Sequence, residues 1–198
     1  MNIFWLNDHP EFAAASHCDK HVIKMLLESC QLMSTAHRVL DGHVRKKAVL
    51  PKDTTHFLTV GQASNTDLIA YKVRDTLVLS DMFLDQKLYS ATHQNHPCAV
   101  WCRQTRANYL WLHELAVSLG HEYTDRYGKI HKCESSGLLD ILATPPRNIP
   151  RGTLTEPALA MPEEYKVAGD PVESYRNYYR KGKNNIATWK HGNIPLWF

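Results

Sequence analysis

Apolar side chains recur every three or four positions through most of this chain, which is the spacing of one face of an α-helix. The longest such stretch, HCDKHVIKMLLESCQLMSTAHR at 17–38, predicts a long central helix. A second helix is expected around Tyr109, ending at Gly120, because glycine commonly follows the last turn. Ser64 and the segment after it, LIAYKVRDTLVLSDMFLDQKLYSAT, predict one long helix or two broken ones.

Near the end of the chain, Asp170, Pro171 and Glu173 suit the N-cap, N1 and N3 positions of a further helix. Alternating strand positions are scarce, and only NIFWL at 2–6 suggests a short strand. We therefore predict a mainly α fold.

Two stretches interrupt the helical pattern. DGHVRKKAVLPKDTTHF at 41–57 gathers Arg45, Lys46, Lys47 and Lys52 with little periodicity, so it predicts an exposed basic loop. The segment from about 144 to 170 is rich in proline and cannot be a continuous helix, so it predicts an extended arm. We expect one compact domain, 1–198, whose last part, 171–198, is a helix followed by a docked tail.

Composition narrows the class of protein. A chain of 198 residues that is 43% hydrophobic can bury one good core. Its start lacks a signal-peptide pattern and no later run reaches the ~20 apolar residues of a membrane span, so we expect a cytosolic protein without a membrane partner. Five cysteines at irregular spacing indicate reduced thiols. A net charge of +3 means that any phosphate recognition must be local.

The polar side chains of 17–38 are unusual in falling on one narrow stripe. At 3.6 residues per turn, an arc of about 100° holds His17, Lys20, His21, Lys24, Glu28, Gln31, Thr35 and Arg38. The rest of the helix is mostly apolar, so the stripe either lines a cleft or is a thin solvated face. Lysine and arginine suit phosphate oxygens, glutamine and glutamate suit a base or a ribose, and histidines can transfer protons.

Zinc is the alternative ligand for some of these residues. His17 and His21 have the i, i+4 spacing of a zinc helix, but Cys18 stands where metalloproteases have glutamate, and two lysines lie nearby. A second set, His93, His96, Cys98 and Cys102, lacks a CxxC knuckle and is a weak metal candidate. We expect His96 and Pro97 to form a turn before a helix, with both cysteines in the core and no cofactor bound.

Aromatic and basic residues are interleaved in the second half. We take Tyr127, Lys129, Tyr178, Arg180 and Lys183 as candidates that bind a nucleotide or nucleic acid, since aromatic rings stack on bases and cations meet phosphates. The alternative is that the rings fill the core. Trp197 and Phe198 predict a tail that docks on its own core or on a second copy of the chain, bringing Tyr178, Arg180 and Lys183 to the cleft of Lys20 and Lys24.

Several motifs together resemble a family of uncharacterised bacteriophage proteins of about this length. They are HCDKHVIKMLLESCQL, TAHR, NHPCAVW, NYLWL, EYTDRYGKIHK, AMPEEYK, YRNYYRKGK and PLWF, and the resemblance runs from end to end. It implies a phage source and the host cytoplasm. HP, a YL helix and the RYG stretch are also similar to the phage pyrimidine-dimer glycosylases, which attack with their N-terminal amine after removal of the initiator methionine. Here Asn2 follows Met1, so no catalytic residue is carried over.

These residues predict a phage enzyme that cleaves a nucleotide or nucleic-acid phosphodiester without a metal, and a signalling nucleotide of host defence is one candidate substrate. His17 and His21 would be the base and the acid, Glu28 would orient one of them, and Lys20, Lys24, Gln31 and Arg38 would bind the ligand. A protein that binds or sequesters nucleotides and a DNA base glycosylase or base-modifying enzyme are the alternatives.

Overall fold

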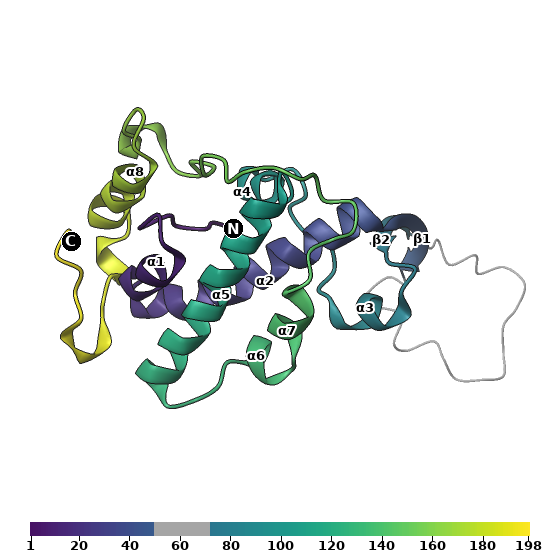
Figure 1. Cartoon of the computed structure of the whole chain (residues 1–198), viewed down its shortest axis with the longest axis horizontal. Coiled ribbons are helices and arrows are strands. Elements are labelled where there is room, and N and C mark those ends of the chain that lie inside the picture. The colour runs from purple at the N-terminus through teal and green to yellow at the C-terminus, as the bar shows by residue number, and fades with distance from the viewer. Residues whose placement is uncertain (50–71) are drawn as a thin grey trace, which may run out of the picture.

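The two longest helices, α2 (Asp19–Asp41) and α5 (Arg106–Tyr127), pack against each other at the centre of the molecule (Figure 1). The computed structural model describes residues 1–49 and 72–198. Helix α1 (Pro10–Ser16) packs on α5, and α4 (Pro97–Cys102) packs on α2. The fold is mainly helical, as the apolar spacing predicted.

Shorter elements complete the helical part. They are α3 (Met82–Lys87), α6 (Lys132–Ser135), α7 (Leu138–Leu142), α8 (Pro171–Asn177), the π-helical turn Tyr178–Gly182, and the 3-10 turns Glu163–Tyr165, Asn184–Ile186 and Lys190–Gly192. The predicted start of α8 is confirmed, since the Asp170 carboxylate accepts a hydrogen bond from the Glu173 amide at 2.8 Å. The predicted turn before α4 is also confirmed, with His96 as N-cap and Pro97 at N1.

An antiparallel hairpin replaces two predicted elements. β1 (His43–Val49) lies where we expected a basic loop, and β2 (Lys72–Val78) lies where we expected helix. Both predictions are wrong for the described residues, because each segment also alternates apolar and polar positions and can pair with the other. The rest of the predicted loop, with Lys52, and the start of the predicted helix at Ser64 lie outside the described residues.

Two smaller predictions are also wrong. Helix α5 runs through Gly120 and ends at Gly128, whose φ of 62° suits glycine. Gly120 stays helical because it is buried against the following elements, where a Cβ would lie 3.2 Å from Glu134 Oε2. The NIFWL segment is not a strand, since Phe4 has a φ of 51°.

The core takes in both ends of the described chain. Residues Ile3 to Leu6 are buried, and the Trp5 ring stacks on Trp111 at 3.6 Å. The tail packs on its own chain, as one alternative predicted: the Trp197 and Phe198 rings meet Tyr179 and Trp189 at 5.9 and 4.6 Å. All five cysteines are buried free thiols.

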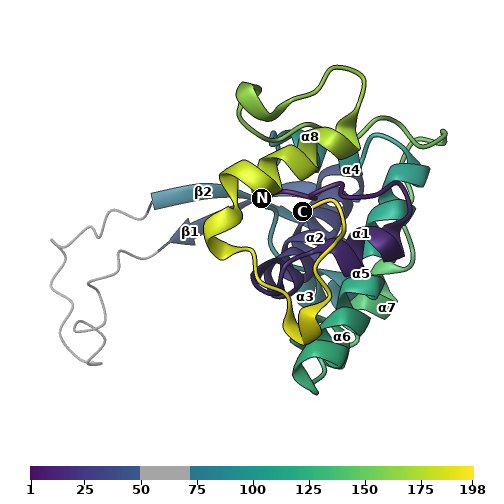
Figure 2. The same ribbon diagram turned by 90° about the vertical axis from the view of Figure 1, so that its left-hand side faces the viewer.

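The proline-rich arm runs without helix or strand from Thr144 to Pro162, crossing from α7 toward α8 (Figure 1). Figure 2 shows the hairpin standing out from the helical body. Among the helices of the two described ranges, none has both the length and the apolar composition of a membrane span.

Candidate functional site

The polar stripe of α2 divides into exposed and buried members. Lys20 and Lys24 are exposed, and Gln31 is half-buried. The buried members are His17, His21, Glu28, Thr35 and Arg38. The stripe therefore is not one continuous ligand-facing row, and its central part, around Glu28, is where polar groups meet open space.

Glu28 forms the polar centre of this region. Its Oε2 accepts a hydrogen bond from the Asn2 amide at 2.9 Å and lies 4.0 Å from the Met1 amine, while Oε1 lies 3.6 Å from Lys24 Nζ. Glu28 is 9% exposed, so the carboxylate is largely shielded from water. It also lines an open pocket of about 450 Å³, which we call the Glu28 pocket.

The opposite wall of the Glu28 pocket comes from the loop between α3 and α4. Besides Met1, Glu28 and Gln31, the pocket is lined by Tyr89, Ser90, Thr92 and His93. Thr35 holds this loop, since its Oγ1 accepts from the Thr92 amide at 3.2 Å and donates to Thr92 O at 3.3 Å. His93 has a φ of 47°, a strained conformation that is often found at functional sites.

Arg38 is a structural clamp rather than a free phosphate ligand. Its guanidinium donates to the carbonyl oxygens of Tyr89, Leu77, Leu88 and Asp85 and to the Asp85 carboxylate. The prediction that Arg38 binds the ligand is wrong, because all these donors are committed inside the fold. The clamp instead ties the pocket loop to β2 and α3.

The two histidines of the predicted acid and base pair lie inside the protein. Burial lowers the pKa of His17 to about 4, and its Nδ1 bonds Ala13 O at 2.7 Å. Burial, with the nearby His17, Lys183 and Lys24, lowers the pKa of His21 to about 3, and its Nδ1 lies 2.5 Å from the Tyr179 hydroxyl. Both rings are therefore neutral at pH 7, and neither is the protonated acid that the pair would need.

The C-terminal candidates reach the stripe only in part. Tyr178 stacks on Phe4 at 5.9 Å, and Phe4 stacks on His21 at 4.4 Å, so an aromatic stack covers the histidine. Lys183 Nζ lies 4.8 Å from the centre of the Tyr178 ring. Arg180 turns elsewhere, donating to the Glu173 carboxylate and to Trp197 O.

Other predicted residues lie apart from the Glu28 pocket. The Tyr127 hydroxyl donates to Asp19 O at 3.2 Å near the end of α5, and the exposed Lys129 follows that helix. Cys98 and Cys102 are buried in α4. Within the described ranges, no three His, Cys, Asp or Glu side chains are grouped as a metal site.

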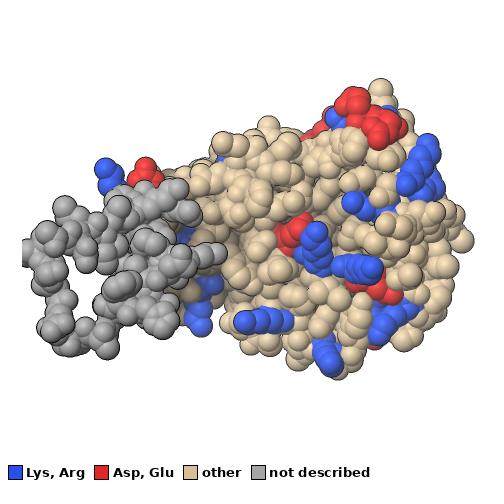
Figure 3. Space-filling model, turned by 180° about the vertical axis from the view of Figure 1, so that it is seen from behind, with Lys and Arg blue, Asp and Glu red and all other residues tan. Residues whose placement is uncertain are grey.

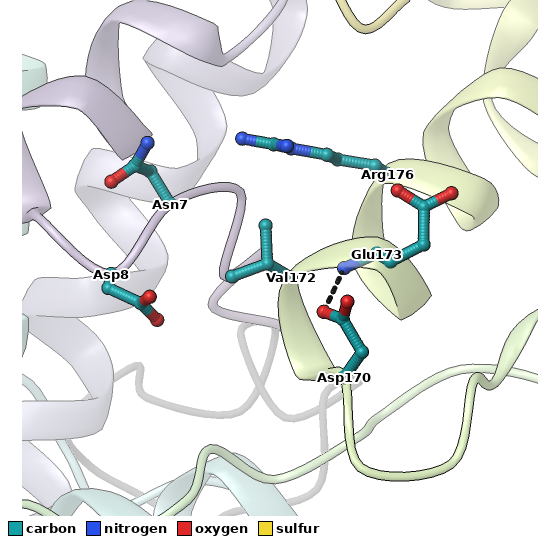
Figure 4. A pocket seen from close by; sticks show the side chains of 6 residues that line it. All are labelled: Asn7, Asp8, Asp170, Val172, Glu173 and Arg176. Atoms are coloured by element: carbon teal, nitrogen blue, oxygen red, sulfur yellow. Dashed lines mark hydrogen bonds between the residues drawn. The ribbon is translucent and has the colours of Figure 1, made fainter.

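Sequence reasoning missed the wall formed by Ser90, Thr92 and the Met1 amine. The one signal for the amine was the apolar start of the chain, which indicates that this segment is buried. A second hollow, of about 330 Å³, lies between the segment before α1 and the start of α8 (Figure 4). Its polar groups serve the fold: Asp170 caps α8, and Arg176 Nε donates to Leu6 O at 3.1 Å.

The distribution of surface charge does not point to a particular binding site. On the face seen from behind, Lys and Arg lie in separate places over the helical body, with Asp and Glu beside only some of them (Figure 3). Comparison with protein-family models, curated proteins and solved structures gives no match. The Glu28 pocket therefore has to be interpreted from its own chemistry.

Proposed function

We propose that the protein is an enzyme that cleaves a phosphodiester of a nucleotide or nucleic acid at the Glu28 pocket, without a metal ion. The observation that carries this proposal is a shielded carboxylate on the wall of an open polar pocket, within 3.6 Å of a lysine ammonium. A volume of about 450 Å³ suits a ligand of nucleotide size.

Five of the lining residues and the neighbouring Lys24 have a role in this proposal. Glu28 takes a proton from the attacking water, and the Lys24 ammonium balances the negative charge that develops on the phosphate oxygens. Gln31, Ser90 and Thr92 can hydrogen bond a base or a ribose. His93, on the pocket rim, replaces the buried His17 and His21 as the histidine that donates a proton to the leaving oxygen.

The test follows products by mass spectrometry from cyclic dinucleotides, NAD-like nucleotides, RNA and DNA, with and without chelator. Glu28→Gln should lower turnover of the active substrate by about 10²-fold or more, because it removes the base. Glu114→Gln, on the exposed side of α5, is the matched control and should keep full activity. Equal turnover in the wild type and in Glu28→Gln would overturn the proposal.

A binding protein is the second candidate, and the contacts of Glu28 favour it. The carboxylate already accepts from the Asn2 amide, so it has a structural role that needs no chemistry. In this case a signalling nucleotide would be recovered intact from the protein, and Glu28→Gln would change affinity without any turnover to lose.

The base-glycosylase alternative gains support from the 4.0 Å approach of the Met1 amine to Glu28. An α-amine that attacks C1′ of a deoxyribose forms a carbon–nitrogen bond while the base leaves with the electrons of the glycosidic bond. Opening of the sugar ring then gives an imine that borohydride reduces to a stable adduct. An intact-mass measurement first has to establish that the mature chain starts at Met1, and an adduct at another residue would contradict this candidate.

A further inference from the structure

A half-buried lysine without a carboxylate partner lies near the His21 end of the α2 stripe. Lys183 directly follows the π-helical turn Tyr178–Gly182, and its Nζ lies 4.8 Å from the centre of the Tyr178 ring. Among the described side chains, Lys183 forms no ion pair and its ammonium donates no hydrogen bond. Lysine is rarely taken out of water without an anionic partner. The contact with the ring offsets part of this cost, and an anionic ligand would offset more of it.

The backbone that holds Lys183 has several uncommon features. A π-helical turn such as Tyr178–Gly182 is rare and is frequently found at functional sites, and this one lies against the first residues of the chain (Figure 2). Gly182 lets the Tyr178 ring approach the backbone closely, because a Cβ there would lie 2.6 Å from that ring. Phe4, which stacks on Tyr178 at 5.9 Å, has a φ of 51°, which is costly for a bulky residue and is typical of ligand sites. These features adjoin one another, so they indicate a site that fixes the position of Lys183.

Lys24 brings a second ammonium group to the same region. It lies about one turn after His21 on α2, and its side chain is exposed. Burial is the main cause of the low pKa of His21, and the charges of Lys183 and Lys24 lower it further, so both ammonium groups lie near this ring. Lys24 Nζ also lies 3.6 Å from Glu28 Oε1, and among the described residues Glu28 is the one carboxylate that pairs with either lysine. Lys24 therefore links the surroundings of Lys183 to the Glu28 pocket.

We propose that Lys183 and Lys24 form a second phosphate subsite beside the Glu28 pocket, and that the ligand is a nucleotide chain with at least two phosphates. One phosphate lies in the Glu28 pocket, and the next one along the chain lies between the two ammonium groups, which suit phosphate oxygens. This proposal rests on the proposed function for the class of ligand. It adds the length of the ligand, because a nucleotide with one phosphate in the pocket would leave Lys183 without a partner.

The test measures binding of a fluorescent single-stranded DNA oligonucleotide to the full chain by anisotropy across a range of salt concentrations. For a single strand, the logarithm of affinity falls with the logarithm of salt concentration by about 0.7 for each phosphate contact. Lys183→Gln removes one such contact, so this slope should become shallower by about 0.7. Lys183→Arg keeps the charge and should keep the slope. Lys181→Gln removes an exposed lysine from the same π-helical turn, so it is the matched control and should leave the slope unchanged.

Several outcomes would overturn the proposal. They are an unchanged slope in Lys183→Gln, an equal change in Lys181→Gln, a slope in Lys183→Arg as shallow as in Lys183→Gln, and absence of strand binding by the wild type. Displacement of the strand by polyglutamate as readily as by unlabelled DNA would also overturn it, because it would indicate an acidic protein partner.

Failure of the proposed function gives a different result. Glu28→Gln should lose turnover and still bind the strand, because Lys183 and Lys24 remain in place. A wild type without turnover whose salt slope becomes shallower in Lys183→Gln would support the phosphate subsite and contradict only the proposed cleavage.

Discussion

At the scale of single residues, burial decides which members of the α2 stripe can take part in chemistry. His17 and His21 have the residue type expected of acid and base groups, yet Phe4 and Tyr179 enclose them and hold both rings neutral. Glu28 lies on the same stripe of α2, but it faces a pocket. The chemistry of a residue type therefore became informative only once its surroundings were known.

The buried histidines predict that the protein loses stability in mild acid. Their pKa values in the native state, about 4 and 3, are below the ordinary value of 6.5, so the unfolded chain takes up protons first as the pH falls. The free energy of unfolding should be fully retained above pH 6.5 and fall by about 3 kcal/mol or more by pH 4. Urea unfolding at pH 7.5, 6, 5 and 4 measures this loss.

Two substitutions make the origin of the loss clear. His21→Phe keeps the stacking on Phe4 and removes one titrating group, so its stability should depend less steeply on pH. His121→Gln, on an exposed position of α5, should behave like the wild type. Identical pH dependence in all three proteins would show that the buried ring is not responsible.

At the scale of elements, the sequence predicted the parts whose pattern is local. The 3.6-residue spacing predicted α2, and the cap residues predicted α8, because each of these signals lies within the helix that it predicts. The hairpin was not predicted because KVRDTLV fits either a helix or a strand. Its strand conformation is determined by pairing with HVRKKAV, almost thirty residues earlier. The pocket wall was not predicted because it also depends on distant contacts. Thr35 and Arg38 hold this loop against α2 by hydrogen bonds.

The Arg38 clamp predicts a large effect from a conservative substitution. Arg38→Lys keeps the charge but cannot supply the planar set of donors that reaches Tyr89, Leu77 and Asp85. We expect a loss of about 3 kcal/mol in the free energy of unfolding, because buried acceptors lose their partners. Chemical denaturation measures the loss, with the exposed Arg147→Lys as the control. A difference below about 0.5 kcal/mol between the two variants would show that the clamp contributes little.

At the scale of the whole molecule, the tail closes the core beside the start of the chain. Trp197 packs on Tyr179, which in turn bonds the His21 ring. The tail therefore helps to shield the His21 end of the α2 stripe from water.

Neighbouring tail residues give a matched test of this role. Trp197→Ser should lower the melting temperature by several degrees, because it removes a partly buried ring from the core. Leu196→Ser should leave the melting temperature unchanged, since Leu196 is fully exposed. Scanning calorimetry measures the melting temperatures of both variants. Equal melting temperatures would mean that the Trp197 ring does not contribute to the stability of the core.

The buried first residues have a consequence for synthesis. Asn2 Oδ1 accepts from the Tyr175 hydroxyl at 3.0 Å, and Leu6 O accepts from Arg176, partners that are made about 170 residues later. At roughly 5 to 20 residues per second, the ribosome needs about 10 to 35 s to make them. During that interval Phe4 lacks Tyr175 of α8, and for the first part of it Trp5 lacks Trp111 of α5, so both rings are available to chaperones. The core around Phe4 can form only after α8 has been made, so the yield of folded protein in a cell should rise with chaperone capacity.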